Sequence, residues 1–396
     1  MGKADHIPVP RYRPFGGATL FAHGFRPFFL AAALWAPVAL LLFLGVFLGW
    51  TGWPALADPM AWHHHELLFG FVAAAVAGFA LTAIPNWTGR LPLQGAPLMV
   101  LAGLWLAGRA AMLLASMLPA WLVAVVDLAF LSALLVVAGR EILAGRNWRN
   151  LPIMLAIGLF LLAHGLAHAD LPASGLAHRL AIAVIITLIA LIGGRIIPSF
   201  THNWLVKQQA ARLPVAFNRF DRLCLALTGL ALLAWTGWPD SLAAALMLAA
   251  ATLLNALRLA RWQGWRTGAN ALLWMLHVSY AWVPLGLALL AASHWLPERL
   301  SPTAGIHALT AGAMAGMILA VMSRATLGHT GRALQAGPGL TTAYALILLA
   351  ALMRVLASVL NAAYLPLLLG AALAWLAAFG LFLTVCGPML LRPRVA

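Results

Sequence analysis

The chain has 396 residues, of which 64% are hydrophobic and only 8% carry a charged side chain. Soluble globular domains have about 25% charged residues, so this composition excludes a water-soluble protein. The formal net charge of +15 does not indicate a nucleic-acid partner, because the basic residues are scattered through short loops without the runs or interleaved aromatic residues of a nucleic-acid surface. Two cysteines, Cys224 and Cys386, are too few for a disulfide scaffold.

Gly and Pro residues divide the apolar sequence into twelve segments, most of them close to the roughly 20 residues that cross a bilayer core of about 30 Å as a helix. No segment alternates with the period of two that a membrane-spanning strand requires, so we expect helices. The predicted spans are residues 27–50, 62–86, 96–118, 120–143, 151–169, 176–198, 220–238, 241–262, 269–293, 303–325, 339–362 and 364–386. The sequence therefore predicts an all-α polytopic membrane protein in a lipid bilayer, with a single transmembrane domain over residues 1–396.

A short sequence, WTGWP, occurs at residues 50–54 and again at 235–239, near the same ends of the first and the seventh predicted helices. This hints at a weak six-plus-six repeat of residues 27–200 and 220–386, which is a common transporter design. Chance is the alternative, because Trp, Gly and Pro are frequent at helix ends.

Lys and Arg residues concentrate at every second connection, and such residues collect on the cytoplasmic side of a membrane. The first tail contains Lys3, Arg11, Arg13 and Arg26. The following alternate connections contain Arg90, Arg140, Arg146, Arg149, Lys207, Arg212, Arg219, Arg222, Arg258, Arg261, Arg266, Arg324, Arg332, Arg392 and Arg394. The intervening connections contain only Arg179 and Arg299. We therefore expect both termini to lie in the cytoplasm.

Ionisable side chains gather near the predicted outer ends of several spans. The layer comprises six histidines, two acids and two arginines: His63, His65, His164, His168, His178, His307, Glu66, Asp127, Arg109 and Arg354. Such groups are costly inside a membrane and usually face a cavity or one another. One histidine alone is more often a packing residue than a ligand. Six at one level, on four helices, favour a metal or haem centre, because imidazole is the commonest nitrogen ligand for haem iron, copper and zinc.

The spacing of these histidines separates them into groups. His164 and His168 are four residues apart and share a helix face, which suits one metal. His63 and His65 are two apart and point to different sides of a regular helix, so either they serve different centres or one donates a hydrogen bond while the other ligates. Carboxylate and thiolate side chains are scarce, which argues against calcium or an iron–sulfur cluster and favours haem or copper.

The charged residues of this layer, and two histidines on the inner side, can be interpreted one by one. Arg109 and Asp127 lie on neighbouring antiparallel predicted helices at matching depth, so they are expected either to neutralise each other or to serve a bound group. Arg354 has no acid at its level, and a bound anion such as a haem propionate would supply one. His277 is a functional candidate because it lies about 12 Å deep from the cytoplasmic side. His329 lies at an inner helix end.

Six motifs and the C-terminal segment together resemble the NnrS family over nearly all of the chain. They are GFRPFFL at 24–30, WHHHELLFGF at 62–71, AIPNWTGR at 83–90, GGRIIPSFT at 193–201, LHVSYAWVPLG at 276–286, IHALTAGAMAGMILAVMSRATLGHTGR at 306–332 and GPMLLRPRV at 387–395. The resemblance implies a bacterial inner-membrane protein that contains haem and copper and is tied to nitric oxide, denitrification and nitrosative stress. The twelve-helix form with outer histidines is also similar to the architecture of haem–copper oxidases, an analogy that does not fix function.

The resemblance also bears on individual residues. His63, His65 and Glu66 match the family pattern WHxHE. The histidine of the fifth span corresponds best to His168, whereas no particular residue is expected at position 164. His277, His307 and His329 stand in matching motifs.

These observations lead to the expectation of a redox protein that binds nitric oxide and reduces it to nitrous oxide. Glu66 is expected to handle protons as the catalytic carboxylate. His65 and His307 are the first candidates for ligation of a b-type haem, and His63 and His168 for a second metal, copper or haem. We expect Arg109 and Arg354 to pair with propionates, with electrons coming from membrane quinol or another donor. The alternatives are a proton- or copper-linked secondary transporter and a non-catalytic haem-based sensor or scavenger of nitric oxide.

Overall fold

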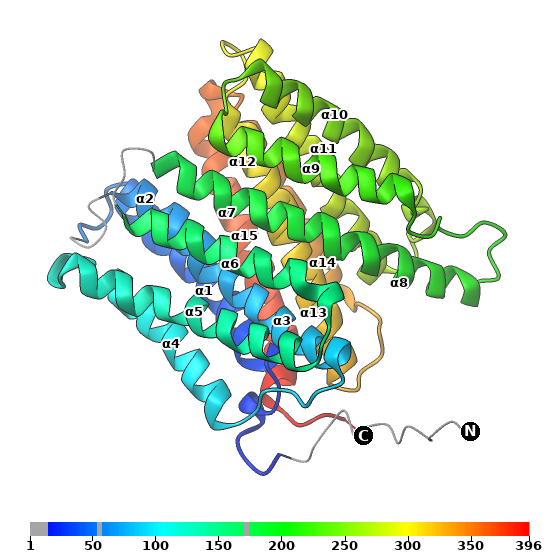
Figure 1. The fold of residues 1–396 in the computed structure, drawn as a ribbon. Helices are drawn as coiled ribbons and strands as arrows, with labels where there is room; N and C mark the ends of the chain where they lie inside the picture. The colour runs from blue at the N-terminus through cyan, green and yellow to red at the C-terminus, as the bar shows by residue number, and fades with distance from the viewer. Residues whose placement is uncertain (1–14, 54–57, 170–173, 396) are drawn as a thin grey trace, which may run out of the picture.

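The structure, a computed structural model, describes residues 15–53, 58–169 and 174–395 (Figure 1). Within these ranges every regular element is a helix, and twelve helices are long and apolar enough to cross a membrane. The predicted all-α fold is therefore confirmed, and the chain is a multi-pass membrane protein. Four residues used in the sequence analysis lie outside the described residues: Lys3, Arg11 and Arg13, which helped to predict the orientation, and Pro54 of the first WTGWP.

The spans fall into two kinds. Those made of a single α-helix are α1 (Phe25–Phe47), α4 (Ala96–Leu113), α5 (Ala120–Ala144), α6 (Leu151–His168), α9 (Arg219–Gly237), α10 (Leu242–Ala260), α11 (Ala271–Trp295), α14 (Pro338–Ala357) and α15 (Tyr364–Leu391). Three further spans contain a π-helical segment: α2 (Pro59–His65), η3 (Glu66–Val72) and α3 (Ala73–Thr88); α7 (Ser174–Leu188), η6 (Ile189–Gly193) and α8 (Gly194–Lys207); α12 (Pro302–His307), η8 (Ala308–Met314) and α13 (Ala315–His329).

Two of the π-helical segments begin directly after a candidate histidine. Segment η3 follows His65 and segment η8 follows His307. A π-helical turn contains an extra residue, which changes the direction of the side chains around it and is frequent at functional sites. These two turns therefore help to set where the predicted outer histidines point.

The predicted end of the sixth span at residue 198 is wrong. Pro198 lies inside α8, and the helix continues to Lys207. A proline removes one backbone hydrogen bond from a helix. Thr201 and Leu205, one and two turns further on, are buried, so packing maintains the helix beyond the proline. The third span also ends early, at Leu113.

Helix faces on the outside of the bundle are apolar. Leu106, Val136, Leu253 and Leu373, on four different helices, are among the most exposed large hydrophobic residues. A lipid environment accommodates such side chains, as the sequence predicts. We name the end of the bundle that carries Asp58 the outer end, following the predicted orientation, and the opposite end the inner end.

The first and last spans lie side by side and are tied at the inner end. The buried guanidinium of Arg26 in α1 donates through Nη1 to the carbonyl oxygens of Met389, Leu390 and Arg392 at 3.1, 2.8 and 2.8 Å. These are carbonyls at the C-terminal end of α15, which have no partner inside the helix. Deeper in the bundle, Trp375 Nε1 donates to the carbonyl of Ala36 at 3.1 Å.

Candidate metal centre

Four side chains converge near the outer end from three different spans. His65 ends α2, Asp127 lies in α5, and His164 and His168 lie in α6. Asp127 Oδ2 lies 3.0 Å from His65 Nε2, 2.8 Å from His164 Nε2 and 2.9 Å from His168 Nε2. One ligand atom from each of the four residues lies within 4.8 Å of all the others. We call these four residues the histidine–aspartate cluster.

A second set of polar side chains surrounds the histidine–aspartate cluster. Arg109 of α4 donates through Nη1 to Glu66 Oε2 at 2.5 Å and through Nη2 to Asp127 Oδ1. Trp35 Nε1 also donates to Glu66 Oε2, at 2.6 Å, and Glu66 Oε1 lies 3.2 Å from His65 Nδ1. Glu66 therefore contacts the nitrogen of His65 that faces away from Asp127. Carboxylate contacts of this kind orient the imidazole ligands of metal sites.

Close helix packing brings these groups together. A Cβ at Gly108 of α4 would lie 2.7 Å from Asp127 Oδ1 and 3.2 Å from Asp127 Cα, so α4 and α5 meet closely one residue before Arg109. A Cβ at Gly70 of η3 would lie 2.6 Å from Trp35 Nε1 and 2.8 Å from Arg109 Nη1. Because neither glycine has a side chain, Asp127 can lie against Gly108, and Arg109 and Glu66 can lie against Gly70.

The chemistry of the histidine–aspartate cluster suits a small metal ion. Its imidazole nitrogens and carboxylate oxygen are ligands that copper, zinc and iron accept. Glu66 and Asp127 are buried and share one guanidinium, that of Arg109. A buried charge needs a partner, and a bound cation or a protonated imidazole would provide it. The four donor groups are too close together to leave room for a porphyrin between them.

The structure groups the predicted histidines differently from the expected pairs. His65 lies with His168, not with His307, while Asp127 and His164 complete the cluster. The sequence suggested one metal for His164 and His168, but neither His164 nor Asp127 was assigned as a ligand. The spacing of four residues between His164 and His168 was the signal for His164. The signal for Asp127 was its predicted depth in the membrane, which matches that of Arg109. The structure confirms an ion pair between these two residues.

A second group of histidines lies nearby at the outer end. His63 stacks on Phe43 with ring centroids 4.1 Å apart, and interacts electrostatically with His307 and Arg354. His307 Nδ1 lies 2.8 Å from the carbonyl oxygen of Thr303. The predicted divergence of His63 and His65 is therefore confirmed, because His65 faces the histidine–aspartate cluster and His63 faces this group. We call His63, His307 and Arg354 the second histidine group.

His64 and His178 lie beside the second histidine group, with ring centroids 5.0 Å apart. Arg354, the predicted propionate partner, is half-buried and donates to Ser358 Oγ at 2.9 Å. Arg109, the other predicted propionate partner, already contacts two carboxylates of the chain itself.

The two remaining predicted residues are on the inner side, away from both groups. His277 is buried in α11, where its Nε2 lies 2.8 Å from Thr201 Oγ1 and its Nδ1 is buried without a hydrogen-bond partner. His329 ends α13 and packs on Phe25 with ring centroids 5.4 Å apart. The described contacts thus connect neither residue to the outer histidines.

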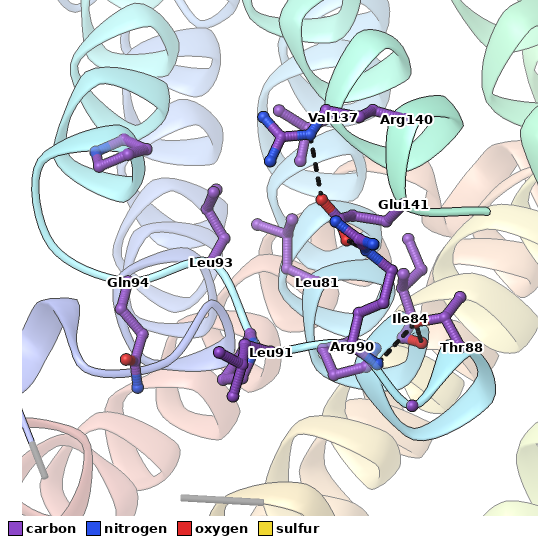
Figure 2. A pocket seen from close by; sticks show the side chains of 14 residues that line it. Leu81, Ile84, Thr88, Arg90, Leu91, Leu93, Gln94, Val137, Arg140 and Glu141 are labelled. Carbon is purple, nitrogen blue, oxygen red and sulfur yellow. Dashed lines mark hydrogen bonds and ion pairs between the residues drawn. The ribbon is translucent and has the colours of Figure 1, made fainter. Parts of the chain in front are cut away.

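A cavity of about 590 Å³ lies at the inner end, between the end of α3, the loop after it and α5 (Figure 2). Arg90 forms an ion pair with Glu141, whose Oε1 lies 3.3 Å from Arg140 Nε. No histidine lines the cavity. Glu141 is 14 residues after Asp127 in α5, about 21 Å along the helix, so this cavity is separate from the candidate metal centre.

Comparison with known proteins agrees with the motifs. A family model described as NnrS protein matches residues 19–394, which is nearly the whole chain. A search of curated proteins found no match. The chain therefore belongs to the NnrS family, a membership that links its function to nitric oxide.

Proposed function

We propose that the protein is a metal-containing redox protein of the bacterial inner membrane that binds nitric oxide and reduces it to nitrous oxide. The observation that carries this proposal is the convergence of three imidazoles and one carboxylate within 4.8 Å, inside a membrane-spanning bundle. Membership of the NnrS family supports nitric oxide as the substrate. Placing the centre on the periplasmic side follows from the predicted orientation.

The histidine–aspartate cluster is the proposed site of a small metal ion, with copper the best fit. His65, His164, His168 and Asp127 would hold it, and imidazole-rich sites suit copper. A redox-active metal there supplies electron transfer and a coordination position for a small ligand. Glu66 and Arg109 are positioning residues, because they hold His65 and Asp127 in place through hydrogen bonds.

The second histidine group is the proposed site of haem. The Nδ1 of His307 is engaged by a backbone carbonyl, which leaves its Nε2 as the nitrogen with a free lone pair. His63 has a buried Nδ1 without a hydrogen-bond partner. Arg354 offers a cation for a propionate. Attachment would be non-covalent, as in a b-type haem, because the sequence contains no C-x-x-C-H motif.

Reduction of two molecules of nitric oxide to nitrous oxide and water consumes two electrons and two protons. His168 is the most exposed member of the histidine–aspartate cluster, with 13% of its side chain accessible, so the centre lies close to the outer surface from which protons come. Glu66 is not one of the proposed metal ligands, and it contacts the free side of His65, with its Oε1 3.2 Å from His65 Nδ1, so it is the proposed proton-handling carboxylate. Membrane quinol is the proposed electron donor.

The test is to purify the protein from cells supplied with iron and copper and to measure its absorption spectrum, its metal content and its nitrous oxide production with a reduced quinol. The proposal expects a Soret band, bound copper and nitrous oxide. Binding of nitric oxide without nitrous oxide would indicate a sensor or scavenger. A protein with neither haem nor metal would favour the transporter alternative and contradict the proposal.

A matched pair of variants connects the activity to the site. His168→Ala should lower copper content and nitrous oxide production by about tenfold or more, the range seen when groups that support a metal site are removed. His202→Ala, a change to an exposed histidine of α8, should leave both unchanged. Equal losses in the two variants would argue against the histidine–aspartate cluster as the centre.

A further inference from the structure

A small apolar cavity of about 100 Å³ lies at the side of the bundle, separate from the inner-end cavity. Its walls come from α1, from α3 and η3, from α6, from α7 with η6 and α8, and from α13. Every lining residue is apolar; the set includes Val72, Ala75, Val76, Ile157, Ile189 and Met317. Apolar cavities of this kind stay dry and bind small apolar molecules and xenon.

One wall of the cavity continues directly to the histidine–aspartate cluster. Ile153 and Ile157 of α6 line the cavity, and Phe160, His164 and His168 follow on the same helix at intervals of three or four residues. Residues at these intervals share a helix face. Ile157 is seven residues before His164, about 10 Å along the helix axis.

A pair of aromatic rings separates the cavity from the cluster. Phe69 of η3 and Phe160 of α6 contact each other with ring centroids 5.2 Å apart, and Phe69 stacks on His164 at 4.3 Å. On the η3 side, Val72 lines the cavity three residues after Phe69. The two rings therefore lie between the cavity and His164, which is a proposed metal ligand.

We propose that this cavity is a binding and transit site for a small neutral diatomic gas, through which nitric oxide reaches the histidine–aspartate cluster from the lipid. The inference rests on the proposed function for the identity of the gas. Val76, Phe79 and Ile192 in its wall are only half-buried, so the cavity opens at the side of the bundle, where a lipid-soluble gas concentrates. A cavity of about 100 Å³ has room for a diatomic gas.

The first experiment measures xenon binding, which needs no metal in the protein. Xenon should occupy the cavity in the wild type, as a crystallographic site or a ¹²⁹Xe chemical shift. Val76→Phe should abolish that binding by filling the space. Val100→Phe is the matched control, because Val100 is exposed on α4 and does not line the cavity. Wild-type protein without bound xenon, or with xenon unaffected by Val76→Phe, overturns the proposal.

The second experiment measures the rate at which nitric oxide returns to the metal after flash photolysis. Val76→Phe should slow association about tenfold, within the range by which association rates change among variants of one site. The dissociation constant should stay the same, because a blocked route slows arrival and departure equally. Phe160→Leu should speed association by opening the ring pair. Each variant is compared at equal metal content, and Ala75→Leu replaces Val76→Phe if the latter does not fold.

The two proposals fail in different ways. If wild-type protein with bound metal does not bind nitric oxide, the proposed function is wrong, and xenon occupancy alone then decides whether the cavity is a gas site. If nitric oxide binds but Val76→Phe and Phe160→Leu leave its association rate at the wild-type value, the transit route is wrong while the proposed function stands.

Discussion

At the scale of single residues, Asp127 has the largest number of partners in the outer layer. Three imidazoles contact its Oδ2 and the guanidinium of Arg109 contacts its Oδ1. It is 1% exposed, so water cannot replace any of these partners. A carboxylate in this position both orients the histidines and neutralises Arg109.

We therefore expect Asp127→Asn to be among the most damaging conservative changes in the protein. Removing one partner from a buried ion pair costs about 3–5 kcal/mol of folding stability, and the amide cannot serve as an anionic ligand. Copper content should fall together with the midpoint of unfolding in mixed micelles. Asp240→Asn, at an exposed position between α9 and α10, should change stability by less than about 0.5 kcal/mol. Full copper content in Asp127→Asn would exclude Asp127 as a ligand.

His23, just before α1 at the inner end, should make stability depend on pH. Burial and then the nearby cations Arg26, His329 and Arg394 lower the pKa of His23 to about 4. Below its ordinary pKa of 6.5 the unfolded chain binds a proton that the folded protein does not bind, so the free energy of unfolding falls as the pH is lowered from about 6.5 to about 4. Above pH 6.5 this contribution is constant.

Unfolding midpoints at about pH 7.5 and about pH 5 measure this effect. The difference between the two midpoints should be smaller in His23→Gln than in the wild type, whereas His202→Gln should keep the wild-type difference. An unchanged difference in His23→Gln would show that His23 is protonated equally in the folded and unfolded states.

Residue types and spacings predicted part of the site. The cost of ionisable groups in lipid identified the outer layer, and helical spacing placed His164 and His168 on one face. Partners from different spans could not be assigned, because the contact of His65 with Asp127 depends on how three spans pack. The sequence also could not show that Glu66 and Asp127 share one guanidinium, since Arg109 could equally have faced a bound anion.

At the scale of elements, the π-helical segment η3 places the proposed metal ligand His65 and its supporting groups together. His65 precedes it, Glu66 begins it, and Gly70 within it lies against Trp35 and Arg109. Trp105 Nε1 donates to the Gly70 carbonyl at 3.0 Å, so the backbone of η3 is also fixed by α4.

Gly70→Ala should therefore disturb the centre without touching a ligand. The added methyl would lie less than 3 Å from Trp35 Nε1, Arg109 Nη1 and Glu66 Oε2, so these groups must move and His65 loses its support. We expect copper affinity to fall by about 10- to 100-fold, as for other losses of groups that support a metal ligand. Isothermal titration of apo-protein with copper measures it.

Gly165→Ala provides the matched control. Gly165 lies between His164 and His168 in the same layer, but a Cβ there meets nothing within 4 Å. Replacing a helical glycine by alanine stabilises a helix by up to about 1 kcal/mol, so this variant should bind copper normally and unfold no earlier than the wild type. A similar loss of copper in both variants would mean that any added methyl group near the histidines lowers copper affinity, whether or not it displaces Trp35, Arg109 and Glu66.

The positions of the spans were predictable, because runs of about 20 apolar residues have few other uses. The π-helical segments were not, since they arise where packing and polar contacts between spans outweigh regular helix geometry. Pro198 illustrates the same limit: its sequence signal indicates a helix end, but burial of the following turns decides otherwise.

At the scale of the whole molecule, the alternation of basic connections predicts which side each end faces. The histidine–aspartate cluster and the second histidine group lie at one end of the bundle, which that rule places in the periplasm. The side matters for function, because it decides the compartment from which protons and metal reach the site.

Cysteine labelling tests the orientation. Trp238→Cys, at an exposed outer connection, should react with a membrane-impermeant maleimide in intact spheroplasts. Gln208→Cys, exposed at the inner end, should react only after the membrane is permeabilised. The native Cys224 and Cys386 are buried and should stay unlabelled. The reverse pattern would place the histidines at the cytoplasmic face.

The contact between Arg26 and the end of α15 has a consequence for biogenesis. Arg26 is synthesised more than 360 residues before the carbonyls that it caps. Until the last helix has been synthesised, this guanidinium lacks its carbonyl partners and must form hydrogen bonds with water or lipid phosphates at the membrane surface. A ribosome that stalls late therefore leaves an unclosed bundle whose earliest helix still lacks its partner, a state that membrane quality-control proteases can distinguish from the finished protein.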